Sequence, residues 1–325
     1  MKRALVTGGA GFIGSHMCAA LVEEGYQVTC LDNFSTGKKA NVAGLKTVQV
    51  LEGDVNEWRF MKELLGSKFE IAFHYAAQVG VQRTEEAPMG VLNDVLGMRN
   101  LARLAKEGVV EKIVFASSSE VYGNPRRLPE KEQDGIIGWT PYTAVKLYGE
   151  HLFASLWQEH HIPTVSLRFF NVYGPRQIGT AYGFVVSIFI NQALAGKNLT
   201  IFGDGRQTRD FVYVEDNVRM TLAAADCQQA WGEVINVGSG HEASILDLAV
   251  LINGVVGTKG QDALKFLPAR NREVARRLAS TKKMAELVGV KSEFSLAEGI
   301  KKTIEERQLN DLWSEEPLRI MAVGV

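Results

Sequence analysis

Four side chains near the middle of the chain have the types and spacing needed for proton transfer. Tyr142 and Lys146 lie four residues apart in "PYTAVKLYGEH", so on a helix both would occupy one face. An ammonium group near a phenol favours the phenolate, which would let Tyr142 act as a base near neutral pH. Ser118 and Glu120 lie in "SSSEVYG", where a predicted strand ends. We expect Ser118, Glu120, Tyr142 and Lys146 to be the catalytic residues, although a lone tyrosine and lysine at this spacing are more often surface residues.

A second motif, "TGGAGFIG", has the spacing of a dinucleotide-binding loop. Gly8, Gly11 and Gly14 follow a predicted strand and open a predicted helix, which permits a tight turn and the close approach of a pyrophosphate. Asp32 ends the next predicted strand, where a carboxylate can accept hydrogen bonds from a ribose diol and would repel the extra phosphate of NADP. The motif therefore predicts NAD. The expected NAD contacts are Gly8, Gly11, Phe12, Ile13, Gly14, Asp32, Asn33, Asp54, Val55, Ala76, Ala77, Tyr142 and Lys146.

These residues need a scaffold, and the apolar periodicity of the first half predicts alternating strands and helices. Predicted strands with few polar residues are separated by helical patterns, which is typical of a parallel sheet covered on both faces. We therefore predict an α/β fold with a Rossmann-like doubly wound parallel sheet. The predicted strands span 3–8, 27–32, 47–54, 71–77, 112–118 and 164–171, and the predicted helices span 12–24, 57–66, 89–107 and 141–160.

The alternation loosens after about residue 172, where short strands end in turns between helical stretches. We predict an NAD-binding region over 1–172 that also carries the catalytic residues. A smaller mixed α/β region over 173–325 would mainly bind substrate, and the chain could cross back between the two. Ligands of open α/β sheets bind beyond the carboxyl ends of the strands, so the predicted site is the cleft between these regions.

Composition and charge favour a small-molecule partner. The 325 residues contain 36 Lys and Arg against 37 Asp and Glu, so there is no overall field to attract nucleic acid or an anionic membrane. The cysteines, Cys18, Cys30 and Cys227, are widely spaced and match neither a disulfide framework nor a metal site. No stretch of 18 apolar residues and no secretory signal pattern occurs. We expect a cytoplasmic protein without a metal.

Seven motifs in order resemble one known family. "TGGAGFIG", "DNFSTG", "HYAAQ", "SSSEVYG", "YTAVK", "RFFNVYGPRQ" and "GDGRQTRDFVYVED" are similar to those of the extended short-chain dehydrogenase/reductases that modify nucleotide sugars, the NAD-dependent epimerase/dehydratase family. The resemblance covers about residues 3 to 306. It implies a nucleoside-diphosphate sugar as substrate, NAD that is regenerated in each turnover, and a homodimer.

The resemblance also implies roles for individual residues. Tyr142 would take the proton of a sugar hydroxyl, usually at C4, while a hydride passes to NAD. Ser118 would hydrogen-bond the same oxygen, and Lys146 would hold the nicotinamide ribose and lower the pKa of Tyr142. Asn171, Arg209 and Arg270 match positions that contact the diphosphate, and arginines suit this task because their planar forks meet phosphate oxygens in pairs. The expected substrate contacts are Ser118, Ser119, Asn171, Arg209 and Arg270.

Glu120 bears on which reaction follows. Relatives that invert C4 need no ionisable group there, whereas a carboxylate could remove the C5 proton once C4 is a ketone and allow loss of water from C6. The order Ser-Glu resembles GDP-sugar 4,6-dehydratases and also UDP-glucuronate decarboxylases. Ser119 replaces the aspartate of dTDP-glucose dehydratases, so Glu120 or water would protonate the leaving group. The leading prediction is a 4,6-dehydratase.

Several alternatives stay open at this point. "AYGFVVSIFI" and "IFGDGRQTRDFVYVED" are similar to 4-epimerases, the close second reading, and UDP-glucuronate decarboxylase is the third. Glu120 could instead cap a turn or pair with an arginine such as Arg126 or Arg127. Asp94 stands where the family usually has asparagine. A regulatory protein that binds NAD without turnover is the non-enzyme reading, but it would not need a tuned phenol.

Overall fold

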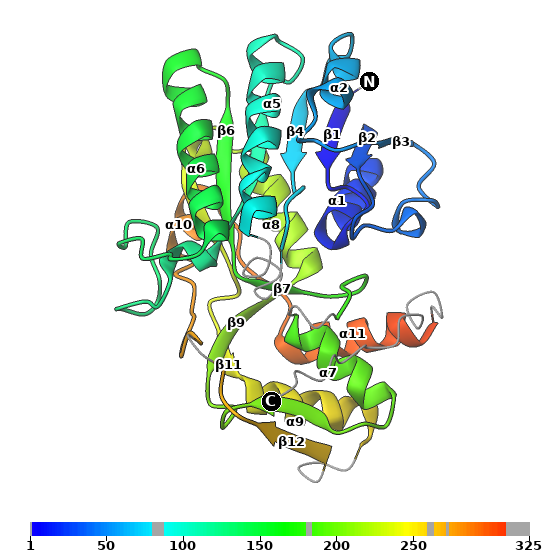
Figure 1. The fold of residues 1–325 in the computed structure, drawn as a ribbon, viewed down its shortest axis with the longest axis vertical. Coiled ribbons are helices and arrows are strands. Elements are labelled where there is room, and N and C mark those ends of the chain that lie inside the picture. The colour runs from blue at the N-terminus through cyan, green and yellow to red at the C-terminus, as the bar shows by residue number, and fades with distance from the viewer. Residues whose placement is uncertain (1, 80–87, 180–183, 259–262, 271–272, 310–325) are drawn as a thin grey trace.

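A seven-stranded parallel sheet forms the larger part of the computed structural model, which describes residues 2–79, 88–179, 184–258, 263–270 and 273–309. Every neighbouring pair in it is parallel, which confirms the predicted fold class (Figure 1). The strand order is β10 (Val234–Val237), β6 (Thr164–Phe169), β5 (Ile113–Ser118), β4 (Ile71–His74), β1 (Arg3–Thr7), β2 (Gln27–Asp32) and β3 (Val48–Glu52).

Helices cover both faces of this sheet. One layer contains α5 (Asp94–Lys106) and α6 (Pro141–His160) with the shorter α2 (Trp58–Met61) and α4 (Pro88–Leu92), and the other contains α1 (Phe12–Glu23) and α8 (Val214–Asp226). Side chains alternate between two cores along β1, since Leu5 packs in the first layer and Ala4 and Val6 pack in the second. No helix within the described ranges is long and apolar enough to cross a membrane.

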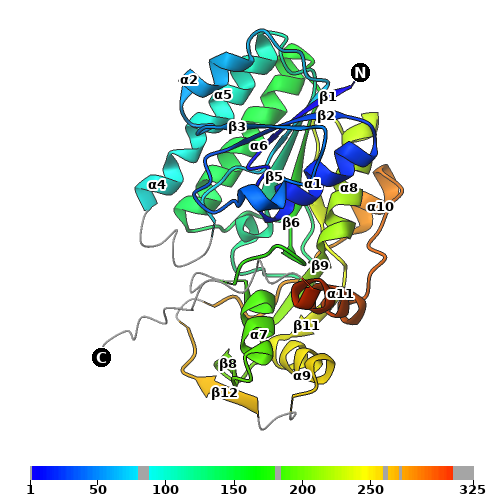
Figure 2. The same cartoon turned by 90° about the vertical axis from the view of Figure 1, so that its right-hand side faces the viewer.

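A smaller region lies beyond the carboxyl ends of the large sheet's strands (Figures 1 and 2). Its three-stranded sheet has the order β11 (Glu242–Ser244), β9 (Thr208–Tyr213) and β7 (Asn171–Tyr173), and β12 (Leu264–Leu267) pairs with β8 (Leu199–Phe202). The helices of this smaller region are α7 (Val185–Leu194), α9 (Ile245–Val256) and α11 (Leu296–Leu309), whereas the short α10 (Lys282–Leu287) lies against β10 of the large sheet.

Some elements differ from the sequence-based expectation. The helix predicted over 89–107 is two helices, α4 and α5, and the helix predicted over 57–66 is the short α2 followed by a 3-10 turn. Neither α11 nor β12 was predicted. Strand β10 comes from the second half of the chain and pairs with β6 in the large sheet. The division near residue 172 into NAD-binding and substrate-binding regions stays a prediction.

A buried ion pair fastens α6 to the sheet behind the predicted catalytic strand end. Glu150 of α6 accepts hydrogen bonds from Arg168 of β6 through both carboxylate oxygens, at 2.9 Å from Nε and 2.8 Å from Nη2. Ser117 of β5 donates to the same carboxylate at 2.5 Å. Both ion-pair side chains are almost fully buried, so each charge depends on its partner for stabilisation.

Removal of the Arg168 guanidinium from this ion pair is expected to destabilise the protein strongly. Arg168→Met should lower the free energy of unfolding by about 3–5 kcal/mol, because the Glu150 carboxylate would be left buried without its cation. Urea unfolding of Arg168→Met measures the change. The matched control is Glu286→Gln, which removes an exposed pair with Lys282 and should cost less than about 0.5 kcal/mol. Equal losses in the two variants would contradict the role of the buried pair.

Candidate functional site

The glycine loop between β1 and α1 is shaped for the close approach of a ligand. Gly8 has a φ of +68°, and a Cβ there would lie 2.7 Å from the backbone nitrogen of Ala76. A Cβ on Gly14 would lie 2.2 Å from the carbonyl oxygen of Gly8. Gly11 precedes the first turn of α1, where Phe12 and Ile13 stand. Free N–H groups at the start of a helix favour phosphate, so this loop fits the pyrophosphate of NAD.

The acidic residues predicted to contact NAD lie at the carboxyl ends of β2 and β3. Asp32 is only 7% exposed, and its carboxylate accepts hydrogen bonds from Ala10 N at 2.9 Å and Phe34 N at 2.8 Å. Each carboxylate oxygen can accept a further bond, so the group remains suited to a ribose diol. Asn33 donates to Asp54 at 3.1 Å, and Val55 follows Asp54 as a buried residue. The structure thus brings these positions together beside the glycine loop.

Asp94 connects α5 to the loop after β4 that contains Ala76 and Ala77. Its carboxylate accepts a hydrogen bond from Gln78 N at 2.7 Å. Burial raises the pKa of Asp94, while the Gln78 N–H and the positive charge of Lys146 act in the opposite direction. The aspartate therefore takes part in a buried arrangement between the loop and Lys146, and α5 starts at Asp94 itself.

The three serines of "SSSEVYG" point to three different partners. Ser117 donates to Glu150 behind the sheet, whereas Ser118 Oγ accepts a hydrogen bond from Glu120 N at 3.2 Å. Ser118 is the N-cap of a 3-10 helix, η3 (Ser119–Tyr122), that turns the chain at the end of β5. Ser119 is buried, and its carbonyl accepts a hydrogen bond from the guanidinium of Arg277. Only Ser118 combines the strand-end position with an interaction with Tyr142.

Tyr142 lies in the first turn of α6, next to Ser118. Pro141 and the reciprocal Thr140 and Thr143 capping bonds fix the start of this helix. Burial raises the pKa of Tyr142 well above its usual value, the Ser118 side chain lowers it in part, and the charges of Glu120 and Asp94 raise it further. The sequence predicted that Lys146 lowers this pKa. In the structure this pKa is raised, chiefly by burial, and the neighbour that lowers it is Ser118.

Lys146 lies one turn further along α6 and is almost completely buried. Its Nζ donates to the carbonyl oxygen of Ala116 at 2.8 Å and lies 5.4 Å from the centre of the Tyr142 ring. Burial lowers the pKa of Lys146 to about 8, against the raising effect of the Asp94 and Glu150 carboxylates. The ammonium is therefore present at neutral pH and is lost as the pH rises through about 8.

Arg277, which the sequence did not single out, holds Glu120 from behind. Its side chain is 1% exposed and its Nη2 lies 3.6 Å from Glu120 Oε1, while the Glu120 side chain is 45% exposed. Nη2 also donates to the carbonyl of Gly123 at 3.1 Å, and Nη1 lies 3.1 Å from Glu130 Oε1. The sequence allowed Glu120 to pair with an arginine such as Arg126 or Arg127, whereas in the structure its partner is Arg277.

Two of the predicted diphosphate contacts lie side by side on neighbouring strands. Asn171 of β7 donates to the carbonyl of Asp210 at 3.1 Å, next to Arg209 of β9. Arg209 donates to the carbonyls of Thr208 and Val274, each at 2.8 Å, and burial lowers its pKa. A guanidinium that is partly buried against carbonyl oxygens is fixed in direction, which suits recognition of a phosphate group.

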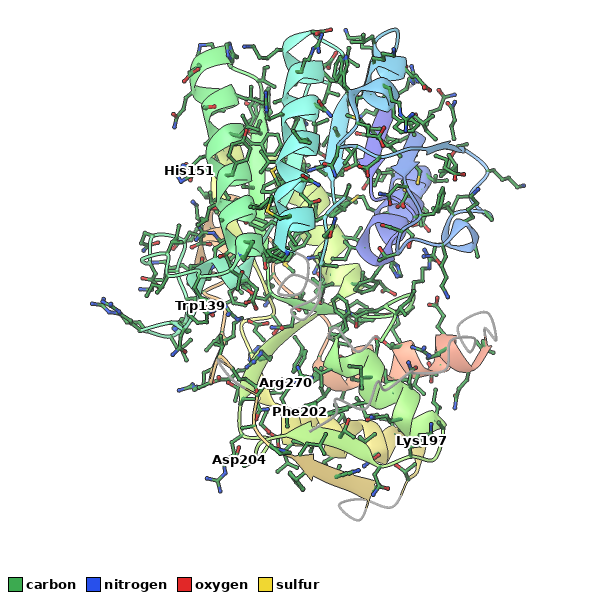
Figure 3. The ribbon with its side chains drawn as sticks, viewed as in Figure 1. Trp139, His151, Lys197, Phe202, Asp204 and Arg270 are labelled. Atoms are coloured by element: carbon green, nitrogen blue, oxygen red, sulfur yellow. The ribbon has the colours of Figure 1, made fainter. Side chains whose placement is uncertain are left out.

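Arg270 belongs to a different part of the smaller region. It is exposed, and its guanidinium carbon lies 4.0 Å from the centre of the Phe202 ring at the end of β8, where Figure 3 shows both residues. No hydrogen bond joins Arg270 to Arg209 or Asn171 among the described residues. Of the epimerase-like stretch "AYGFVVSIFI", residues 181–183 lie outside the described residues, and the rest forms the start of α7.

Sequence reasoning missed Arg277, Glu130 and Glu150. Arg277 occurs in the basic run "ARNREVARR", but a run of this kind does not tell which arginine turns inward. Glu150 carried a usable signal, because it follows Lys146 by four residues and so lies on the same face of α6. No group of three or more His, Cys, Asp or Glu side chains that could hold a metal ion occurs in the described ranges.

The fold and this site define a nucleotide-binding enzyme with a tyrosine and a lysine at the carboxyl edge of the sheet. Comparison with known proteins identifies the protein family. The model of the NAD dependent epimerase/dehydratase family matches residues 4–238. The chain belongs to this family.

Several relatives of known name match nearly the whole chain. A Methanocaldococcus jannaschii protein with a provisional name as a UDP-glucose 4-epimerase is 39% identical over 92% of this chain and 96% of its own. The UDP-N-acetyl-alpha-D-glucosaminuronate decarboxylase of Bacillus cytotoxicus is 35% identical over 94% and 97%. The structure of UDP-glucose 4-epimerase with UDP-glucose from Thermotoga maritima has a TM-score of 0.89 at 32% identity, covering 95% of this chain and all of that one. Proteins named as epimerases and a protein named as a decarboxylase thus match this chain at similar sequence identity.

A side chain at position 14 in the glycine loop should weaken the binding of NAD. Gly14→Ala places a methyl group against the Gly8 carbonyl, so the loop must shift and NAD binding should weaken about tenfold or more, or by about 1.4 kcal/mol. Fluorescence titration with NADH and the cofactor content of the purified protein measure the loss. Gly254→Ala in α9 is the matched control, since a Cβ there meets no atom within 4 Å. Normal cofactor content in Gly14→Ala would contradict the assignment of the loop.

Proposed function

We propose that this enzyme oxidises a UDP-sugar transiently at C4 and then removes water across C5 and C6, which makes it a sugar-nucleotide 4,6-dehydratase. The observation that carries the proposal is the ion pair between Glu120 and Arg277 beside Tyr142. UDP is chosen because the similar proteins carry UDP-sugar names. The 4,6-dehydration is chosen because the partly exposed Glu120 carboxylate is available as a base.

The first step uses residues on α6 and at the end of β5. Tyr142 acts in its phenolate form and receives the proton of the C4 hydroxyl, and Ser118 hydrogen-bonds the same oxygen. NAD, when bound, supplies a hydride acceptor at C4 and later a hydride donor at C6. Lys146 would hold the ribose of the cofactor, and its ammonium places a positive charge 5.4 Å from the centre of the Tyr142 ring. The product of this step is a 4-keto sugar whose C5 hydrogen is acidified by the neighbouring carbonyl.

Glu120 then acts on C5. Arg277 Nη2 lies 3.6 Å from its carboxylate, and 45% exposure of the side chain leaves that carboxylate open to a ligand. Glu120 takes the C5 proton as the electrons of the C5–H bond form the C5–C6 double bond and the C6–O bond breaks. The same carboxyl group can return that proton to the leaving hydroxide, so water departs and Glu120 is again ionised. A solvent proton finally adds to C5 when C6 receives its hydride.

Loss of carbon dioxide from a C6 carboxylate is supported less well by this arrangement. Such a carboxylate would approach the negative charge of Glu120. Arg277 lies behind Glu120, is 1% exposed and already donates to two carbonyls and the Glu130 carboxylate. A neutral hydroxymethyl group at C6 meets no such repulsion. The electrostatics of the site therefore favour dehydration over decarboxylation.

A 4-epimerase is the second candidate, and the names of the similar proteins favour it. In that case Tyr142, Ser118 and Lys146 would act as described, the 4-keto sugar would rotate, and the hydride would return to the other face of C4. Glu120 and Arg277 would then only stabilise η3. The two candidates differ in whether the C5 hydrogen exchanges with solvent.

The hydride step should depend on the Tyr142 hydroxyl. Tyr142→Phe removes the acid–base group and should reduce turnover about 100-fold or more while NAD remains bound. The nicotinamide absorbance after addition of a UDP-sugar, together with cofactor content, measures both properties. Tyr148→Phe on the outer part of α6 is the matched control and should behave as the wild type. Unchanged turnover in Tyr142→Phe would refute the shared first step.

Heavy water should distinguish the reactions. Incubation with UDP-hexoses in D₂O should yield a sugar lighter by one water with deuterium at C5, detected by mass and proton spectra. Glu120→Gln should lower formation of this product about 100-fold or more, because the base is absent, and leave the nicotinamide absorbance change intact. An isomer of unchanged mass without deuterium at C5 would instead establish the 4-epimerase, and release of carbon dioxide from a UDP-uronate would establish the decarboxylase.

A further inference from the structure

One buried cation faces two carboxylates at the floor of the site. Arg277 lies 3.6 Å from Glu120 Oε1 and 3.1 Å from Glu130 Oε1. The side chains of Glu130 and Arg277 are each 1% exposed, whereas that of Glu120 is 45% exposed. If both carboxylates are ionised, the three groups together carry one uncompensated negative charge, and part of it is fully buried, which is costly.

The main chain fixes Glu130 in this place. Its N–H donates to the carbonyl of Leu278 at 2.8 Å, and its own carbonyl accepts from Ser280 N at 2.8 Å. Its second carboxylate oxygen accepts from Leu278 N at 3.0 Å. Glu130 is therefore held against Arg277 from both sides and cannot turn out to solvent without losing these bonds.

The environment of Glu130 makes it a group that changes charge near neutral pH. Burial raises its pKa to about 7, Arg277 and the Leu278 N–H act to lower it, and the charges of Glu120 and Asp210 raise it. Glu130 is therefore largely protonated below about pH 7 and ionised above it. The pKa of Glu130 depends on the charge of Glu120, because the two carboxylates share one arginine.

Other charged groups packed around the three are already paired. Asp210 of β9 accepts hydrogen bonds from Ser239, Gly240 and Ala279, and Glu132 accepts from Asn236 N. Arg209 lies 3.5 Å from Glu273, and its pKa senses Arg277, Glu120 and Glu130. These groups add a background field, but only Glu120 and Glu130 contact the Arg277 guanidinium through carboxylates among the described residues.

We propose that Glu130 is a positioning residue that compensates the charge of Glu120, releasing a proton to solvent as Glu120 takes up the C5 proton. Before the step Glu120 is ionised and Glu130 is neutral. After it Glu120 is neutral and Glu130 is ionised, so the net charge of the two carboxylates and Arg277 is zero in both states. When Glu120 passes the C5 proton to the leaving hydroxide and is ionised again, Glu130 takes a proton back from solvent, which closes the cycle. Glu130 never touches the substrate and acts through Arg277. The inference rests on the proposed function for its catalytic use, but the coupling of the two carboxylates does not.

The coupling can be measured without turnover. The full-length holoenzyme is labelled with ¹³C at the glutamate side-chain carboxyl carbon, and the Glu130 signal is identified by its loss in Glu130→Gln. We expect it to titrate near pH 7 in the wild type and about one pH unit lower in Glu120→Gln, which imitates the protonated Glu120. Glu132→Gln, two residues away and facing Asn236, is the matched control and should leave the midpoint unchanged. Equal midpoints in the wild type and Glu120→Gln would overturn the proposal.

A second measurement tests the catalytic use. One pH unit of coupling corresponds to about a tenfold change in the equilibrium for transfer of the C5 proton. Glu130→Gln should therefore slow deuterium incorporation at C5 about tenfold and leave the absorbance change of the hydride step unchanged, whereas a merely structural defect would affect both. If the wild type incorporates no deuterium at C5, the dehydratase proposal fails, and the titration still decides whether Glu130 and Glu120 are coupled.

Discussion

Buried positive charge at the carboxyl edge of the parallel sheet is the constraint on which this site depends. Lys146, Arg168 and Arg277 are each 4% exposed or less. An isolated buried cation costs several kcal/mol, so each must have oxygen partners that are fixed in place. β5 and the turn that follows it provide Ala116 O for Lys146 and Ser119 O and Gly123 O for Arg277. Arg168 pairs with Glu150 of α6, and Ser117 of β5 donates to the same carboxylate. The stretch "SSSEVYG" is thus held on several sides, and Ser118 and Glu120 acquire fixed directions from it.

A further set of contacts fixes the segment before α10 relative to the turn that follows β5. Tyr122 donates to Asn236 of β10 at 2.7 Å, and Asn236 donates to the carbonyl of Glu130 at 2.9 Å. Glu130 in turn bridges to Ala279, two residues after Arg277. The chain of bonds runs from the large sheet through the loop before α6 to the segment before α10. A sugar held by groups of the smaller region would therefore meet Tyr142 and Glu120 at a defined position.

The sequence predicted what depends on local spacing and failed where long-range packing decides. The period of apolar residues was sufficient for the strands of the sheet, and helical spacing placed Tyr142 and Lys146 on one face of α6. Arg277 could not be found in this way, because it meets Ser119 across 158 positions. The pKa of Tyr142 is raised in the structure, whereas the sequence predicted that it is lowered. The spacing revealed the nearby lysine, but it could not reveal the burial of the phenol. Short elements such as β12 are too brief for a periodicity to be recognised.

In the proposed function the choice between dehydration and inversion is made on the C5 side of the sugar, because the two candidate reactions share their first step at C4. Glu120 takes part in both steps through its charge. The negative charge of Glu120 raises the pKa of Tyr142, so Tyr142 holds the proton it has taken from the C4 hydroxyl for as long as Glu120 is ionised. That is the state in which the sugar is a ketone and its C5 hydrogen is acidic. In the proposed dehydration Glu120 is ionised again once it has passed the C5 proton to the leaving hydroxide, so the C4 ketone is retained in the product. An ionised carboxylate in this position therefore opposes the return of the proton to the C4 oxygen, a return that inversion at C4 requires and that dehydration does not.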